Sequence, residues 1–138
     1  CGSIPYQLYT DLILPYSKRI LNAARENNCP TIFFPKDIGN GVSIIDKSIC
    51  DYVSVDWHTP IDHARKIIDS ELGIQGNMDP RIFYQDYSEI EEYLNSLINF
   101  GSQNQNWIFN LGHGFLPDID HKKVKFVVDW IKDKDWNR

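Results

Sequence analysis

The chain of 138 residues predicts an α/β fold in which four parallel βα units follow a leading helix. Four short apolar runs, rich in β-branched or aromatic residues, are spaced along the sequence. Segments with helical periodicity separate them, each long enough for a parallel crossover. A polar or glycine-rich group follows each run directly. Because the carboxyl ends of parallel strands share one face, we expect the functional residues there.

The first half of the chain predicts two strands. Apolar residues at spacings of three and four indicate a helix over residues 6–27, which Pro15 should kink. Two asparagines and a proline end this helix, and residues 31–34 form the first strand. After a glycine-rich loop, the pattern predicts a brief helix over residues 44–49 and a second strand over residues 52–55.

The third strand is predicted over residues 73–77, after a helix that ends near Asp69. Thr59 suits the N-cap of that helix because its hydroxyl can accept a hydrogen bond from a free N–H of the first turn. Pro60 suits the first helical position, where no N–H is needed.

The last unit begins with a helix that Ser88 can cap, with Glu91 three residues on completing a capping box. This helix should run to about Phe100 and end at Gly101. Residues 107–111 form the fourth strand. The final helix has an apolar stripe of Val124, Val127, Val128 and Ile131.

The size of the chain bears on how the sheet closes. A whole (βα)8 TIM barrel needs about 250 residues, so four units fit one half of such a barrel. The chain opens with Cys1 and its only methionine is Met78. We therefore expect residues 1–138 to be the C-terminal half of a single barrel domain, with the N-terminal half absent. An open four-stranded flavodoxin-like sheet is the alternative.

Composition excludes several classes of protein. There are 14 Lys and Arg against 19 Asp and Glu, and no basic block. Such a surface is unsuited to nucleic acid or an anionic membrane, because phosphate binding needs clustered cations. No apolar run approaches the length of a bilayer span, and the start lacks the pattern of a signal peptide. We expect a cytoplasmic protein with reduced cysteines.

Several polar residues near the strand ends are expected to be structural. Asp56 could orient Lys36 across the mouth of the sheet, but an internal ion pair is as reasonable, and a structural role is favoured. Gln75 and Asn77 should bind neighbouring strand-end loops, and Asp79 with Pro80 should start a helix. We expect solvated imidazoles without a partner at metal-ligand spacing at His58, His63 and His121. Burial is expected for the rings of Trp107, Trp130 and Trp136.

Four segments together resemble the C-terminal half of the uroporphyrinogen decarboxylase family. They are residues 7–16 (QLYTDLILPY), 55–57 (VDW), 74–80 (IQGNMDP) and 108–118 (IFNLGHGFLPD). The last two are the more specific, and both fall at predicted strand ends. The resemblance covers essentially the whole chain and none of the family's N-terminal half.

The resemblance implies a (βα)8 barrel, usually a homodimer, that needs no metal or organic cofactor. Its reaction removes the four acetate carboxyls of uroporphyrinogen III to give coproporphyrinogen III in haem biosynthesis. The family's key arginines, aspartate and tyrosine lie in the N-terminal half, and its Ser/Thr site lies just before Cys1. No catalytic residue is therefore expected within this chain, and the chain alone should be inactive.

His113, in the NLGHG motif, is the one substrate-contacting residue that the resemblance carries over. An imidazole there can hydrogen-bond a propionate or acetate carboxylate and can also transfer a proton. We favour the binding role. Gly112 and Gly114 leave the backbone bare on both sides, so that a bulky ligand can approach.

Two other functions stay open. A corrinoid-linked methyltransferase of the same superfamily would activate a thiol on zinc, typically through a His-x-Cys pair and a distant cysteine. Here the position two after His113 is Phe115. A non-enzymatic, truncated product is the second alternative, because half of the expected site is missing.

Overall fold

A computed structural model of the protein describes residues 2–136 and has an α/β fold with one four-stranded parallel sheet. The strands follow the sheet in chain order: β1 (Ile32–Phe33), β2 (Tyr52–Ser54), β3 (Gly73–Gln75) and β4 (Trp107–Ile108). The predicted class and all four strands are thus confirmed. The strands are shorter than expected, and the predicted ends at Asn77 and Leu111 are replaced by an isolated parallel bridge between Met78 and Leu111.

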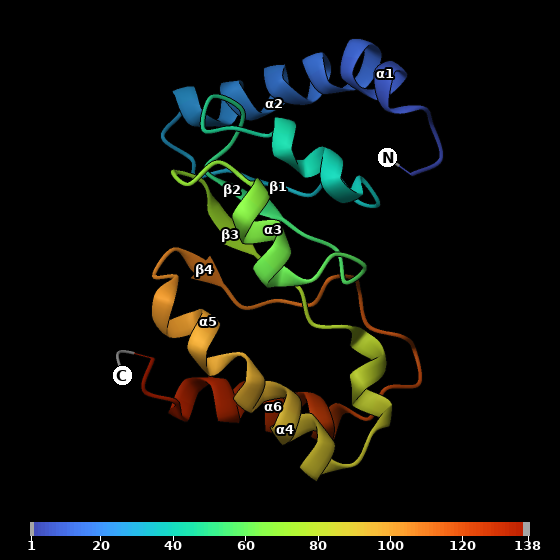
Figure 1. The fold of residues 1–138 in the computed structure, drawn as a ribbon, viewed down its shortest axis with the longest axis vertical. Helices are drawn as coiled ribbons and strands as arrows, with labels where there is room; N and C mark the ends of the chain where they lie inside the picture. Colours follow the sequence, from blue (N-terminus) through green and yellow to red (C-terminus); the bar gives the residue numbers. More distant parts are fainter. Residues whose placement is uncertain (1, 137–138) are drawn as a thin grey trace.

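The helices lie mainly at the two ends of the molecule (Figure 1). Helices α1 (Tyr6–Leu8) and α2 (Leu14–Glu26) lie beyond β1 at one end. Helices α4 (Tyr87–Ser96), α5 (Ile98–Gln103) and α6 (His121–Asp133) lie beyond β4 at the other. Between them, α3 (Ile61–Ile67) lies by the sheet. The sheet therefore lies between two groups of helices, and its outer strands β1 and β4 face different groups.

The leading helix is irregular before Pro15. A π-helical turn over Tyr9–Ile13 joins α1 to α2, and the Leu14 N–H donates to the Tyr9 carbonyl. Pro15 then falls in the first turn of α2, where its missing N–H costs nothing. The predicted kink is thus replaced by one widened turn. The brief helix expected over residues 44–49 lies earlier, as a 3-10 helix over Gly39–Ile44.

Two predicted helix starts were wrong. The N-cap of α3 is Pro60, with no side-chain cap, and Thr59 lies outside the helix. Helix α4 (Tyr87–Ser96) uses a capping box of Asp86 and Glu89, whose carboxylate accepts the Asp86 N–H at 3.0 Å. Asp86 and Glu89 have the same spacing as Ser88 and Glu91. The sequence pattern therefore fits both capping boxes, and the backbone geometry distinguishes between them.

The helix after Ser88 is divided. A second helix, α5 (Ile98–Gln103), follows α4, and Gly101 lies inside it instead of ending the helix as predicted. Glycine is needed at this position because Trp136 and Trp107 leave no room for a Cβ. Helix α6 (His121–Asp133) closes the chain, with the predicted stripe only partly buried: Val127 is buried and Val128 is exposed. None of the helices in residues 2–136 has the length and apolarity needed to cross a bilayer.

The core has two parts. The larger joins the sheet to α3 and the 3-10 helix and contains fully buried Val53, Ile74 and Leu72. The smaller joins α4 and α6 and contains Met78 and Ile90. Burial of such side chains is the main source of stability in a domain of this size.

A second set of apolar side chains is exposed. They are large and lie on the π-helical turn, on α2, and on or directly after the two outer strands: Leu12, Tyr16, Ile20, Ile32, Phe34 and Ile108. The buried hydroxyl of Tyr9 beneath this surface has no hydrogen-bond partner among the described residues. These faces are the opposite of the core: apolar, but left to solvent in residues 2–136.

Candidate functional site

The segments that follow the four strands are joined into one surface, which we call the strand-end face. The Asp37 N–H, after β1, donates to Asp56 Oδ2, after β2, at 2.9 Å. Asn77, after β3, donates from Nδ2 to the Asp56 carbonyl at 2.8 Å. Gly112, after β4, donates its N–H to the Met78 carbonyl at 2.9 Å. Hydrogen bonds thus link each strand end to its neighbour.

Asp56 is the centre of this network and is a structural residue. It is only 4% exposed, and its Oδ2 accepts the Asp37 N–H while its Oδ1 accepts the His58 N–H at 3.0 Å. A buried carboxylate is costly unless it is bonded in this way. These hydrogen bonds agree with the favoured structural role. Lys36 forms an ion pair with Asp37, at 3.3 Å between Nζ and Oδ2.

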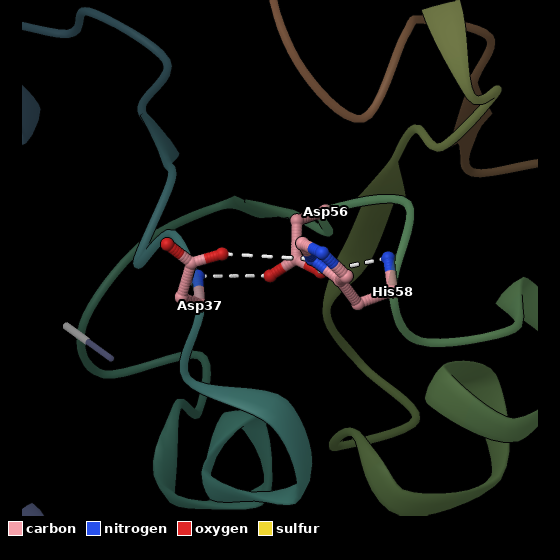
Figure 2. A group of neighbouring side chains, drawn as sticks. All are labelled: Asp37, Asp56 and His58. Carbon is pink, nitrogen blue, oxygen red and sulfur yellow. Dashed lines mark hydrogen bonds and ion pairs between the residues drawn. The ribbon is translucent and has the colours of Figure 1, made fainter. Parts of the chain in front are cut away.

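For His58 the prediction of no partner at metal-ligand spacing was wrong. Its Nδ1 lies 3.3 Å from Asp56 Oδ1 and 3.6 Å from Asp37 Oδ1, so it has partners at metal-ligand spacing (Figure 2). The three side chains offer ligand atoms within 4.8 Å of one another. The sequence does place one acid after each of two neighbouring strands, with His58 two residues from the second acid. The spacing within a single segment does not show that Asp37 joins the other two residues.

The chemistry of this cluster is explained by its hydrogen bonds. Both oxygens of Asp56 already accept backbone N–H groups, and Asp37 has a φ of 60°, a conformation in which its N–H reaches Asp56. A metal ion would have to compete with these bonds for the same oxygens. The arrangement therefore fits a structural cluster that connects the ends of β1 and β2 better than it fits a set of metal ligands.

The end of β3 carries the predicted scaffold roles. Gln75 Nε2 donates to Ser54 Oγ at 3.1 Å, and Asn77 binds the loop after β2. Gly76 has a φ of 125°, and a Cβ there would lie 2.7 Å from the Val55 carbonyl oxygen. Only glycine fits such a conformation at such a distance. The peptide bond between Gly76 and Asn77 is cis.

Asp79 starts the next element as expected. It is the N-cap of a 3-10 helix over Pro80–Tyr84 and accepts the Arg81 N–H at 2.9 Å. Its carboxylate also pairs with Arg81 Nη2 at 2.7 Å. Burial acts to raise the pKa of Asp79, but the hydrogen bonds and the charge of Arg81 outweigh it and hold that pKa below its usual value.

Arg81 was not singled out by the sequence prediction. Its guanidinium carbon lies 3.9 Å from the centroid of the Trp57 ring, and the His58 ring stacks on the same indole at 4.1 Å between centroids. The pairing with Asp79 raises the pKa of Arg81, so the group is a permanent cation. A cation, an indole and an imidazole therefore lie together on the strand-end face.

His113 is on a loop that is fixed on both sides. Before it, Gly112 packs so tightly on the backbone of Trp57 that a Cβ would overlap it. After it, Phe115 packs on Phe83 with ring centroids 5.5 Å apart, and Tyr84 donates its hydroxyl to Asp118 at 2.6 Å. The expectation that Gly112 is bare for a ligand was wrong, because the protein itself occupies that space.

The tip of this loop is open. His113 is exposed, and its Nδ1 lies 3.4 Å from the Gly114 carbonyl oxygen. No atom lies within 4 Å of a Cβ placed on Gly114. Gly114 therefore retains the role that Gly112 loses, and the substrate-binding role of His113 stays a prediction.

The other expected residues lie outside this surface. His63 is exposed on α3, with Nε2 3.0 Å from Asn40 Oδ1, and His121 is exposed at the start of α6. The expected surface positions of these two are confirmed. The three tryptophans are half-buried, and Trp136 packs edge-to-face with Trp107 and Trp130 at 5.7 and 6.1 Å. Their predicted burial is confirmed in part.

The chain is similar to proteins named uroporphyrinogen decarboxylase. The chain is 36% identical to a uroporphyrinogen decarboxylase of Wigglesworthia glossinidia brevipalpis over 134 residues, covering 94% of this chain and 37% of that protein. It is 33% identical to one from Trichlorobacter lovleyi over 123 residues, or 89% of this chain and 36% of the relative. The chain thus spans little more than a third of the length of the relatives that it matches.

The family comparison agrees with these pairwise matches. The model of the family described as "Uroporphyrinogen decarboxylase (URO-D)" matches residues 1–134, which include every strand and the strand-end face built above. The sheet of four parallel strands is consistent with part of a barrel of that family. The chain belongs to the uroporphyrinogen decarboxylase family.

Proposed function

We propose that this chain forms the C-terminal part of an enzyme that removes the four acetate carboxyls of uroporphyrinogen III to give coproporphyrinogen III. The observation that carries the proposal is the family match over residues 1–134, together with an exposed His113 on a loop fixed at both sides of the strand-end face. The reaction needs neither a metal nor an organic cofactor, because the protonated pyrrole itself accepts the electrons that carbon dioxide leaves behind.

The proposed role of His113 is to bind a carboxylate of the substrate. Its ring is exposed while the residues around it are anchored, so the imidazole is presented from a rigid base. The open space at Gly114 leaves room for a large ring beside it. A hydrogen bond from the imidazole to an acetate or propionate would orient the tetrapyrrole rather than transfer the proton.

The three strand-end carboxylates are already engaged within the described residues. Asp56 is buried and bonded to backbone N–H groups, and Asp79 is paired with Arg81. Asp37 lies beside Lys36 and His58. We infer that the cation-stabilising carboxylate and the proton donor come from the part of the domain that the relatives have and residues 1–138 lack.

The rest of that domain also explains the exposed apolar faces. Ile32 on β1, Phe34 directly after β1 and Ile108 on β4 are 47%, 41% and 36% exposed, at the two outer strands of the sheet. Four further βα units would pair with both edges and close a (βα)8 barrel. We infer a cytoplasmic homodimer of such barrels, in line with the family resemblance.

The methyltransferase alternative is less well supported. Both cysteines among residues 2–136, Cys29 and Cys50, precede a strand and so lie toward the amino ends of the sheet. Burial is the main cause that raises the pKa of Cys50 to about 11, which disfavours the thiolate that zinc requires. The strand-end face therefore receives no thiol from either residue.

The function is tested with the protein purified as its gene encodes it. We expect turnover of uroporphyrinogen III to coproporphyrinogen III, followed by chromatography of the oxidised porphyrins, and no turnover by residues 1–138 alone. His113→Ala should raise KM about tenfold, the loss expected for one hydrogen bond to a charged group, with kcat within about threefold.

The matched control is His63→Ala, which removes an exposed imidazole from α3. It should change neither KM nor kcat. Absence of any porphyrinogen turnover by the encoded protein would refute the proposed function. A loss of several orders of magnitude in kcat at unchanged KM would instead make His113 an essential proton donor.

A further inference from the structure

Arg81 has unused hydrogen-bonding capacity on the strand-end face. Its Nε and Nη2 donate to the Asp79 carboxylate, at distances between 2.7 and 3.1 Å. Its Nη1 has no hydrogen-bond partner among residues 2–136. The side chain is 58% exposed, so Nη1 is within reach of a ligand in solution. The N–H groups of Nη1 can donate a charge-assisted hydrogen bond to a carboxylate.

The position of this guanidinium is fixed by the residues beneath it. It lies over the Trp57 ring, with 3.9 Å between the guanidinium carbon and the ring centroid. Trp57 is in turn held by the tight packing of Gly112 on its backbone and by the stacked His58 ring. Binding through Arg81 therefore costs less side-chain entropy than binding through a free surface arginine.

The other described arginines are unsuited to this role. Arg19 and Arg25 lie on α2, and Arg25 pairs with Asp51 just before β2, toward the amino ends of the strands. Arg65 lies on α3 and donates to backbone carbonyls, including that of Leu72 at 2.7 Å. Among residues 2–136, Arg81 is the one arginine in a segment that follows a strand directly.

Arg81 and His113 also lie on either side of the same support. The residue before His113 packs on the Trp57 backbone, and Arg81 covers the Trp57 ring. This face carries the carboxylates of Asp37, Asp56 and Asp79, and Lys36 pairs with the first and Arg81 with the last. A ligand with several carboxylates would be repelled unless cations oppose its charge. Such a ligand needs a second positive contact besides an imidazole.

We propose that Arg81 binds a carboxylate of the tetrapyrrole substrate through Nη1, with the Trp57 ring as its support and Asp79 as the group that orients it. This inference rests on the proposed function, because it takes the substrate class from it. It adds an anion-binding residue on the 3-10 helix after β3 to the one proposed after β4, so that two carboxylates of one tetrapyrrole are held from neighbouring strand ends.

The test compares Arg81→Gln, Arg81→Lys and Arg19→Gln in the protein as its gene encodes it. Arg81→Gln should raise KM for uroporphyrinogen about tenfold and leave kcat within about twofold. Arg81→Lys, which keeps the charge but loses the planar fork, should recover part of that loss. Arg19→Gln removes an exposed arginine from α2 and should change neither parameter.

A second measurement separates this inference from the proposed function. Uroporphyrin, the oxidised octacarboxylate, is titrated into each variant and binding is followed by quenching of tryptophan fluorescence, which needs no turnover. About tenfold weaker binding by Arg81→Gln supports the inference even if the protein decarboxylates nothing. Equal affinity of Arg81→Gln and the unaltered protein, or an equal loss in Arg19→Gln, overturns it.

Discussion

Asp56 follows β2 and His113 follows β4 of the same sheet, yet their surroundings are opposite. Asp56 is 4% exposed and each of its oxygens accepts a backbone N–H. His113 is exposed, and its one described contact is at 3.4 Å to the adjacent residue. The comparison teaches that chemical reactivity of a residue type does not identify a site. What matters is whether the fold has already used its hydrogen bonds.

The largest effect expected from this comparison is on stability, at Asp56. Asp56→Asn replaces one acceptor oxygen by an N–H₂ group, which then faces a backbone N–H. We expect a loss of about 3 kcal/mol in the free energy of unfolding, measured by urea denaturation. Glu91→Gln, an exposed acid on α4, is the control and should change it by less than about 0.5 kcal/mol. Equal effects of the two substitutions would mean that Asp56 is not the anchor of the strand-end face.

Gly112 and Gly114, on either side of His113, allow a second comparison of a packed and an open position. In Gly112→Ala the new methyl group would overlap the Trp57 backbone, so we expect a loss of about 2 kcal/mol and a weaker hold on the loop. In Gly114→Ala the methyl group enters open space, and the free energy of unfolding should stay within about 0.5 kcal/mol. Thermal unfolding of both variants measures the difference. If Gly114→Ala were the more destabilising, the described packing of this loop would be incorrect.

The smallest effect expected is the pH dependence at Asp79. The pKa of its carboxyl is lower in the folded protein than the ordinary value near 4, so its contribution to stability is present above about pH 4. That contribution is lost as the pH falls through the lowered, folded-state pKa. Asp79→Asn keeps an N-cap side chain but removes the charge, and should lower Tm by about 2 °C at pH 7.

The difference in Tm between Asp79→Asn and the unaltered protein should shrink as the pH is lowered from 5 toward 2, because both then carry a neutral side chain. Scanning calorimetry over this range provides the measurement. Asp62→Asn, an exposed acid in the first turn of α3, serves as a comparison for a general effect of losing one negative charge. A difference that grows on acidification would contradict the pairing of Asp79 with Arg81.

Much of the fold could be predicted from the sequence because its signals are local. The strands appear as short apolar runs, and Asp79 with Pro80 marks a helix start that the structure confirms. The capping box was misplaced from Asp86 and Glu89 to Ser88 and Glu91, since both frames satisfy the same pattern of residue types. Local pattern limits the possible boundaries, but the backbone geometry selects one.

The α/β class, the parallel strands and the family could all be predicted from the sequence, because they depend on periodicity and on contiguous motifs such as 108–118. Only the tertiary structure decided how the polar strand-end residues are used. Asp37, Asp56 and His58 come from two segments, as do Gly112 and Trp57, and residues far apart in sequence meet only when the strands pair. Hydrogen bonds and close packing act over a few ångströms, so the use of a side chain is set by those spatial neighbours.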